Sequence, residues 1–433
     1  MSSIDHEIDQ AVVSSGLFAG SEELRAIRYG PQRRAGRPLR LLTFTTLFPN
    51  REQPNHGIFV ENRLRHLIAN GEVESVVVAP VPYFPASAHG FGEWGKYARI
   101  ERREERHGLV IHHPRYLVIP RVGMSVSPAL LAAGTIGSVR RLLAEGGDVD
   151  AIDAHYFYPD GVAAAWIAKQ IGRPVVITAR GTDVNLIPRY RLPRRMMQRT
   201  IATADGFIAV SAALKGALID LGAAPDSVRV LRNGVDANLF RPTDRARARC
   251  ALGLSRPTLL SVGHLIERKG HDRVIAALPD LSEFELLIVG EGPERGRLTQ
   301  LIATLGLGGR ARILGSVPHA ELPMIYTAAD ALVLASSREG WANVLLESMA
   351  CGTPVVASNI WGNPEVVSAP EAGVLAIENT SRGITEAVRR LFQSIPDRAA
   401  VRRYAEGFSW RETTEGQLAL FRQVLAHHQS RGR

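Results

Sequence analysis

The chain has 433 residues, of which 45% are hydrophobic and 22% charged, a composition typical of a globular protein with two or three domains. Its net charge is +9, but it has no interleaved aromatic and basic motif and only 6% aromatic residues, so we predict no nucleic-acid partner. An anionic membrane surface or an anionic lipid-linked substrate accounts better for the charge.

Short Val, Ile and Leu runs alternate with helical patterns from Leu39 onward, as is typical of parallel sheets covered on both faces. Residues 1–36 precede them as an arm to which we assign no function. The first series of predicted strands is RLLTFTTLF, VESVVVAP, LVIHHPRYLV, VDAIDAHY, PVVITAR, GFIAVS and VRVLRNG. The second series is TLLSVGHL, FELLIVGEG, ARILGSV, ALVLASS, PVVASNI and GVLAI.

Two such series predict an α/β protein with two Rossmann-like domains that face each other across a cleft. The turn-rich stretch NGVDANLFRPTDR separates the series, so we place the first domain at 37–240 and the second at 241–410. A final helix, about 411–430, follows the aromatic residues Phe408 and Trp410.

The segment SSREGWANVLLESMACGTPVVAS carries Glu339 and Glu347, which are eight residues apart. A buried strand, 331–337, leads into a loop, and an apolar-faced helix follows over about 343–350 and ends before Gly352. Ligands of open α/β sheets bind at this edge, and the helix N-terminus favours phosphate. Because carboxylates repel phosphate, Glu339 and Glu347 are not suited to bind the phosphate itself. They are suited to bind hydroxyl-rich parts of the ligand on either side of the phosphate. A sugar nucleotide has that layout.

The segment resembles the E-x7-E motif of the retaining family-4 glycosyltransferases, which have the GT-B fold, and the resemblance covers roughly residues 39–427. It implies that Glu339 faces the donor sugar as a catalytic residue and that Glu347 binds the ribose. Without the resemblance the two residues read as a surface loop acid and a helix-face acid. The implied donor contacts at the start of the helix are Gly340, Trp341, Ala342, Asn343 and Val344. The resemblance also implies that the final helix packs back on the first domain.

The segment SVGHLIERKGHD supplies the implied cations. Lys269 would stabilise the leaving diphosphate as a catalytic residue, and it is one of four lysines among 52 basic residues. The family usually has arginine directly after Gly263, where this chain has His264. Arg268, or His264 as a neutral donor, would then supply the second contact, and the alternative for Arg268 is a solvated loop charge.

Two more loops complete the implied donor site. Gly290 and Gly292 follow the next strand, where the family pattern requires a glycine loop, although a tight turn alone also explains them. Val317 lies in the segment 316–319, whose backbone would read the edge of the nucleobase. The donor would be a sugar linked to UDP or GDP, and it is a substrate, so we expect no cofactor.

The first domain would bind the acceptor. The implied acceptor-side residues are Asn55, His56, Gly57, Arg180 and Asp183. An ordinary loop is the alternative for the first three, and Arg180 stands where the family commonly has histidine. His155 comes at the end of a strand, directly before a helix, so we expect it at the cleft as a catalytic residue, with a structural role as the alternative.

The resemblance implies a retaining reaction in which the departing phosphate takes the proton of the acceptor. We find no paired aspartates or histidine-rich cluster with metal-ligand spacing, so we expect no metal. The combination of FVENRL, ITARGTDVN and REGWANVLLES is similar to bacterial teichuronic-acid and exopolysaccharide glycosyltransferases. We therefore expect a hexosyltransferase of polysaccharide biosynthesis with a lipid-linked or soluble glycan acceptor. A sugar-nucleotide epimerase and a non-catalytic sugar-nucleotide-binding protein are the alternatives.

Cysteine spacing and apolar runs bear on location. Cys250 and Cys351 fit neither a disulfide nor a metal motif, no apolar run is as long as a membrane span, and MSSIDHEIDQAVV lacks signal-peptide character, so we expect a cytoplasmic protein. The segment 185–199 mixes five arginines with apolar residues, which suits the headgroup region of an anionic bilayer. A solvated helix face is the equal alternative to peripheral membrane binding.

Overall fold

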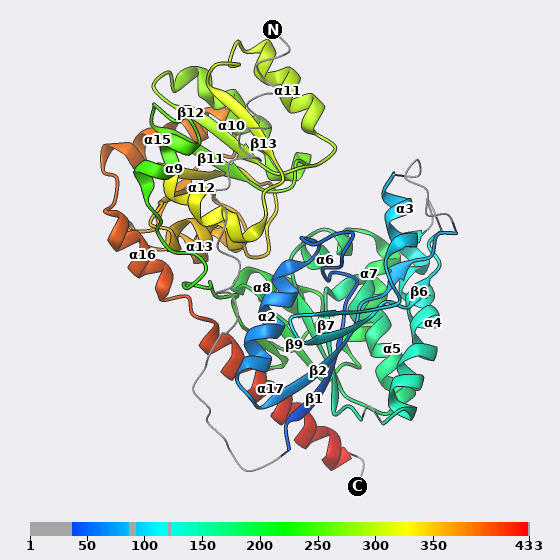
Figure 1. Ribbon diagram of the computed structural model, residues 1–433. Helices are drawn as coiled ribbons and strands as arrows, with labels where there is room; N and C mark the ends of the chain where they lie inside the picture. The colour runs from blue at the N-terminus through cyan, green and yellow to red at the C-terminus, as the bar shows by residue number, and fades with distance from the viewer. Residues whose placement is uncertain (1–36, 86–91, 120–122, 147, 432–433) are drawn as a thin grey trace.

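The computed structural model describes residues 37–85, 92–119, 123–146 and 148–431, and the predicted arm at 1–36 lies outside them. The described chain forms two α/β domains joined by a linker (Figure 1). The first sheet has the order β10-β9-β8-β7-β1-β2-β5-β4, and all its neighbours are parallel except β4 and β5. Its strands are β1 (Leu39–Phe44), β2 (Val73–Val78), β4 (Arg103–Arg106), β5 (Leu109–His112), β7 (Ala151–His155), β8 (Val175–Ala179), β9 (Gly206–Ala209) and β10 (Val228–Val230).

Helices cover both faces of this sheet. They are α2 (Ile58–Ala69), α3 (Gly92–Arg99), α4 (Gly123–Ala144), α5 (Val162–Ile171), α6 (Thr182–Asn185), α7 (Arg191–Ile201) and α8 (Ala212–Asp220), with the shorter turns η2 (Phe157–Gly161), η3 (Ile187–Arg189) and η4 (Pro225–Ser227). A separate two-stranded ladder pairs β3 (Val81–Pro82) with β6 (Arg115–Tyr116). Strands β7 and β8 are wholly buried, and β1 is buried from Leu41 onward, as expected of central strands covered on both faces.

The second sheet is parallel throughout, in the order β13-β12-β11-β14-β15-β16. Its strands are β11 (Thr258–Val262), β12 (Glu285–Val289), β13 (Ala311–Gly315), β14 (Ala331–Leu334), β15 (Val355–Ser358) and β16 (Gly373–Ala376). Its helices are α9 (Arg245–Ala251), α10 (His271–Ala277), α11 (Arg295–Thr304), α12 (Leu322–Ala328), α13 (Asn343–Ala350), α14 (Asn363–Val366), α15 (Ser381–Gln393) and α16 (Arg398–Glu406), with η5 (Glu267–Lys269), η6 (Leu278–Asp280) and η7 (His319–Glu321). The two Rossmann-like domains that we predicted are thereby confirmed.

The last helix, α17 (Trp410–Arg431), leaves the second domain and runs along the first, as Figure 1 shows. Its buried side chains Leu418, Phe421 and Val424 pack with residues of the first sheet such as Val176 and Ile208. The C-terminal helix is therefore attached to the first domain, and the chain passes between the two domains a second time.

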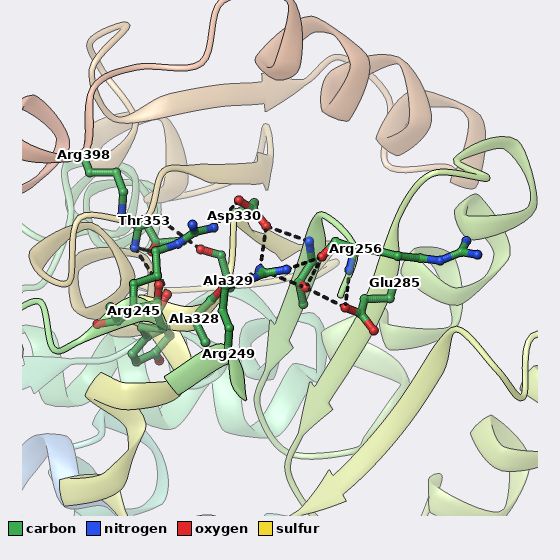
Figure 2. A network of polar contacts seen from close by, with 12 residues as sticks. Arg245, Arg249, Arg256, Glu285, Ala328, Ala329, Asp330, Thr353 and Arg398 are labelled. Atoms are coloured by element: carbon green, nitrogen blue, oxygen red, sulfur yellow. Dashed lines mark hydrogen bonds and ion pairs between the residues drawn. The ribbon is translucent and has the colours of Figure 1, made fainter. Parts of the chain in front are cut away.

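At the amino ends of the strands of the second sheet, side chains form a network of hydrogen bonds and ion pairs (Figure 2). Asp330 pairs with Arg245 at 2.5 Å and with Arg249 at 3.2 Å, and it also accepts a hydrogen bond from the backbone N–H of Thr258. Burial and the neighbouring Arg245 lower the pKa of Arg398 to about 10. These contacts close the edge opposite the candidate site.

Two details of the strands differ from the prediction. The segment LVIHHPRYLV is not one strand, because Pro114 lacks an N–H and divides it into β5 and β6, which belong to different ladders. The antiparallel edge strand β4 has the charged sequence REER and carries no apolar pattern. Its inward residue, Glu104, is buried against His113, with 3.0 Å between Oε1 and Nε2.

Candidate active site

Two glycine loops meet at the carboxyl ends of β11 and β12. A Cβ on Gly290 would lie 1.9 Å from the carbonyl oxygen of Gly263, and one on Gly292 would lie 2.5 Å from that of Leu265. The backbones therefore pack directly on each other, which only glycine allows. His264 is exposed beside them, and Val317, in the loop after β13, is partly buried against the core.

Lys269 and Glu339 form an ion pair, although the sequence suggested separate roles for them. Nζ of Lys269 lies 2.7 Å from Oε1 of Glu339, and Nη1 of Arg268 lies 3.8 Å from Oε2. Burial of the carboxyl would raise the pKa of Glu339, but the charges of Lys269 and Arg268 outweigh it and lower that pKa. Glu339 is therefore an anion that already holds the two predicted phosphate-binding cations.

The N-terminus of α13 has no side-chain cap. Its N-cap, Ala342, provides no side-chain hydrogen bond, so the first N–H groups of the helix are free of a side-chain cap. Trp341 is only 6% exposed, and its ring packs against Phe408 at 6.0 Å between centroids. The ring of Trp341 therefore belongs to the core, so a donor contact at this position is left to the backbone, as for Asn343 and Val344 at the helix start.

Glu347 lies one turn further along α13 and is held by two partners. Its Oε2 accepts a hydrogen bond from the hydroxyl of Tyr326 at 2.9 Å, and its Oε1 lies 3.5 Å from Nε2 of His319. Burial lowers the pKa of His319, but the hydrogen bond and charge of Glu347 raise it by more. The sequence analysis did not single out Tyr326, which reads as an ordinary apolar-face residue of α12.

The domains touch where the predicted donor and acceptor loops face each other. A Cβ on Gly340 would lie 1.8 Å from the carbonyl oxygen of Arg180, and one on Gly181 would lie 3.0 Å from the backbone nitrogen of Gly340. In addition, the side-chain amide of Asn233 in the linker donates to Oδ1 of Asn343 at 3.1 Å. The loop after β8 therefore lies directly against the loop that carries Glu339.

His155 lies beneath this contact and not at an open cleft, where we expected it. It is 1% exposed, its Nδ1 accepts a hydrogen bond from Arg180 at 2.7 Å, and its Nε2 lies 3.3 Å from Asp153. Burial lowers its pKa to about 4 against the opposing effect of Asp153, so the ring is neutral near pH 7. His155 thus links a buried carboxylate to Arg180.

Arg180 and Asp183 are also interior residues. Arg180 is 8% exposed and donates to Oδ1 of Asn233 at 3.3 Å, and burial, aided by the charge of Arg63, lowers its pKa to about 9. The carboxylate of Asp183 is fully buried and accepts the backbone N–H groups of Phe157, Arg180 and Gly181. These contacts shape the loop that meets Gly340, and they leave Asp183 no exposed oxygen for an acceptor.

The loop after β1 holds the remaining acceptor-side candidates. Asn55 is exposed, while the ring of His56 bonds the carbonyl oxygen of Thr46 at 3.0 Å and Gly57 directly precedes α2. The backbone N–H of Thr46 donates to Asp160 at 2.6 Å, and burial raises the pKa of that carboxyl to about 7. Asp160 therefore fixes the position of this loop.

Tyr156 is a candidate that the sequence analysis missed. It follows His155 at the end of β7, is half-buried, and has φ of +79°, a backbone conformation that is strained for a tyrosine. Burial and the charges of Asp183 and Asp160 raise the pKa of its phenol, and the charge of Arg268 from the other domain lowers it. Only the unusual φ marks this position, and no sequence signal would have revealed it.

The described residues include neither a metal-binding cluster nor a membrane-spanning helix. The described part of the chain holds no cluster of three or more His, Cys, Asp or Glu side chains that could bind a metal ion. The longest described helices, α4 and α17, have 22 residues each, and no described helix is apolar enough over a sufficient length to cross a membrane.

Comparison with known proteins relates both domains to one enzyme class. Residues 57–239 match the family Glycosyltransferase Family 4, and residues 243–408 match Glycosyl transferases group 1. D-inositol 3-phosphate glycosyltransferase 1 of Catenulispora acidiphila is 30% identical over 430 residues, a match that covers 91% of this chain and 98% of the relative. The putative teichuronic acid biosynthesis glycosyltransferase TuaC of Bacillus subtilis is 27% identical, with 75% of this chain and 82% of the relative covered.

A solved structure shares the fold of the whole described chain. The Anabaena protein HepE in complex with UDP-glucose matches with a TM-score of 0.64 at 18% identity, over 90% of this chain and 99% of that one. At this identity the likeness concerns the arrangement of the two domains.

Proposed function

This chain belongs to the family-4 glycosyltransferases of GT-B fold, and on that premise we propose that it moves one sugar from a nucleotide-diphosphate donor to a polyprenyl-diphosphate-linked glycan in surface polysaccharide synthesis. The observation that carries the proposal is the arrangement of Glu339 and Glu347 on either side of the uncapped N-terminus of α13. The likeness to TuaC supports the choice of a polysaccharide pathway. The reaction belongs in the cytoplasm.

The donor would lie along the loops of the second domain. Glu347, already a hydrogen-bond acceptor for Tyr326, would take the ribose hydroxyls, and the first N–H groups of α13 would take the diphosphate. Glu339 would turn from Lys269 to the sugar hydroxyls, which frees Lys269 and Arg268 for the phosphates. The UDP-glucose complex of HepE supports a uridine nucleotide, and a guanosine nucleotide is the alternative.

The proposed reaction retains the anomeric configuration and uses no metal. The acceptor oxygen forms the new bond to the anomeric carbon, while the bond to the diphosphate oxygen breaks and its electron pair stays with the diphosphate. The acceptor proton passes to the departing phosphate oxygen. Lys269, Arg268 and the α13 N–H groups would stabilise the charge that develops there, which is the largest expected contribution to catalysis.

The residues beneath the site would position it. His155, Arg180 and Asp183 are buried, so we propose that they hold the loop that faces Gly340 and do not contact substrate. Tyr156, half-buried at the same edge and within electrostatic reach of Arg268, takes the place on the acceptor side that we had expected for His155.

A second candidate acceptor is a soluble inositol phosphate. The similarity to D-inositol 3-phosphate glycosyltransferase 1 of Catenulispora acidiphila favours it, because the match spans 98% of that relative. The two acceptors share a phosphate group and differ in the presence of a lipid, so a direct comparison separates them.

The test is a transfer assay in which each nucleotide sugar is offered alone, with inositol phosphate, and with a polyprenyl-diphosphate glycan. Consumption of donor only in the presence of the lipid-linked acceptor, with retained configuration by proton coupling, supports the proposal. Consumption with inositol phosphate alone assigns the second candidate. Conversion of the donor sugar without any acceptor would instead identify an epimerase, and binding without conversion a sensor.

A further inference from the structure

Exposed apolar side chains are concentrated on one part of the first domain. Of the twelve large apolar residues that stand out as exposed in the described chain, eight come from four neighbouring stretches, around β3, α3, the region from β6 to the first turn of α4, and η3 with α7. They are Tyr83, Trp94, Leu117, Ile119, Met124, Val126, Tyr190 and Leu192. Such a concentration of exposed apolar side chains is unusual on the surface of a monomer that binds no partner.

These stretches are contiguous. The backbone N–H of Tyr83 bonds the carbonyl oxygen of Tyr116, and the ring of Trp94 lies 5.8 Å from that of Phe84, so α3 adjoins the ladder of β3 and β6. The hydroxyl of Tyr158 then contacts both the carbonyl of Met124 in α4 and the sulfur of Met196 in α7. Figure 1 shows α3, β6, α4 and α7 on the same side of the first domain.

The η3 and α7 part of this surface carries arginines that pair with no carboxylate of the described chain. The segment 185–201 contains five arginines and no Asp or Glu. All five are exposed, and within the described chain none of their side chains pairs with a carboxylate. By contrast, two exposed helical arginines elsewhere, Arg382 and Arg411, each pair with a glutamate four residues further along the same helix. The five arginines are Arg189, Arg191, Arg194, Arg195 and Arg199.

The burial of α7 separates the two explanations that its sequence left open. Met197 is fully buried and packs inward, as a solvated amphipathic helix requires. Tyr190 and Leu192, however, are 48% and 46% exposed, so apolar side chains stand among the unpaired arginines on the outer surface. A protein surface that combines arginine with tyrosine and leucine is typical of contact with the headgroup region of a bilayer.

We infer that these eight apolar residues and five arginines form a docking face for an anionic lipid bilayer. The face begins at η3, which directly follows α6 and the Gly181 loop that touches Gly340, so docking brings the edge of the acceptor domain to the membrane. This deepens the proposed function, since a polyprenyl-linked acceptor is met there. Binding to the bilayer itself requires no catalysis.

The experiment is co-sedimentation of the full chain with vesicles of equal parts phosphatidylglycerol and phosphatidylcholine, and with vesicles of phosphatidylcholine alone, at low salt. We expect binding to the anionic vesicles only, and weaker binding as salt rises. The variant R194Q/R195Q/R199Q should bind about 100-fold more weakly, at roughly fivefold for each arginine removed. The variant Y190S/L192S should also lose binding, while keeping every charge.

The matched control is R241Q/R247Q/R403Q, which removes the same charge from exposed positions of the second domain and its flanking segment and should bind like the parent. Nucleotide affinity measured by calorimetry shows that each variant is folded. Equal loss in both triple variants, or no binding of the parent to anionic vesicles, overturns the inference. Vesicle binding by a protein without transferase activity refutes the proposed function and leaves the docking face intact.

Discussion

Lys269 and Glu339 lie 2.7 Å apart, between Nζ and Oε1, so a predicted phosphate-binding cation and a predicted sugar-binding carboxylate form one ion pair. In this arrangement each side chain directs part of its hydrogen-bonding capacity to the other residue. The pair compensates the charges of the buried Glu339 and the half-buried Lys269. Substitution of either residue should therefore leave the charge of the other without this partner.

Replacement of Lys269 by alanine should lower turnover by about 100-fold or more, because a cation beside a leaving diphosphate acts mainly in the transition state. Lys269→Arg should restore part of the rate. Steady-state kinetics over a pH series measure this, and the pH profile should also move because Glu339 loses the charge that lowers its pKa. The exposed Lys169→Ala is the control, and near-normal turnover of Lys269→Ala would remove it from the reaction.

Glu347→Ala should weaken nucleotide binding by roughly 1.5–3 kcal/mol, which is typical of a lost charge-assisted hydrogen bond. Calorimetry with the nucleoside diphosphate is the measurement. Tyr326→Phe removes the phenol that bonds Glu347 but leaves the carboxylate, so it should cost about 1 kcal/mol of stability and affect affinity less. Equal affinity of a folded Glu347→Ala variant and the parent would exclude a ribose contact.

Gly340→Ala should separate the domains, because the added Cβ would lie 1.8 Å from the carbonyl oxygen of Arg180. The donor residues all belong to the second domain, so turnover should fall at least about tenfold while nucleotide affinity changes less. Kinetics and small-angle scattering measure the two effects. Gly308→Ala meets no atom within 4 Å and serves as the control, and a Gly340→Ala variant with full activity would contradict the contact.

His155 should make stability depend on pH. Its folded pKa of about 4 lies below the ordinary 6.5, so between those values the unfolded chain binds the proton and the folded protein does not. Its contribution relative to His155→Gln should therefore rise with pH by up to about 1.4 kcal/mol per unit and level off above pH 6.5. Urea unfolding of the parent and of His155→Gln at several pH values tests this, and a difference that stays constant between pH 4 and 6.5 would contradict it.

Local patterns in the sequence were sufficient for the elements that carry the site. Helix α13 has the predicted bounds, because an apolar helical face follows the loop and Gly352, with φ of +78°, stands just beyond its end. The same rules place Glu339 before the helix and Glu347 one turn into it. Most parallel strands of both sheets were predictable because they are apolar on both faces, whereas the charged antiparallel strand β4 was not.

The contacts within the site could not be predicted from the sequence, because they join residues that only the tertiary structure brings together. Glu339, which accepts a hydrogen bond from Lys269, is 70 residues away in the sequence. Gln417, which accepts a hydrogen bond from the buried Arg63, is 354 residues away. Periodicity describes only near neighbours, so it could not show that His155 and Asp183 are enclosed or that Tyr156 is half-exposed beside them. The sequence by itself determined which residues stand at the strand ends, and packing of the two domains decided which of them can meet a ligand.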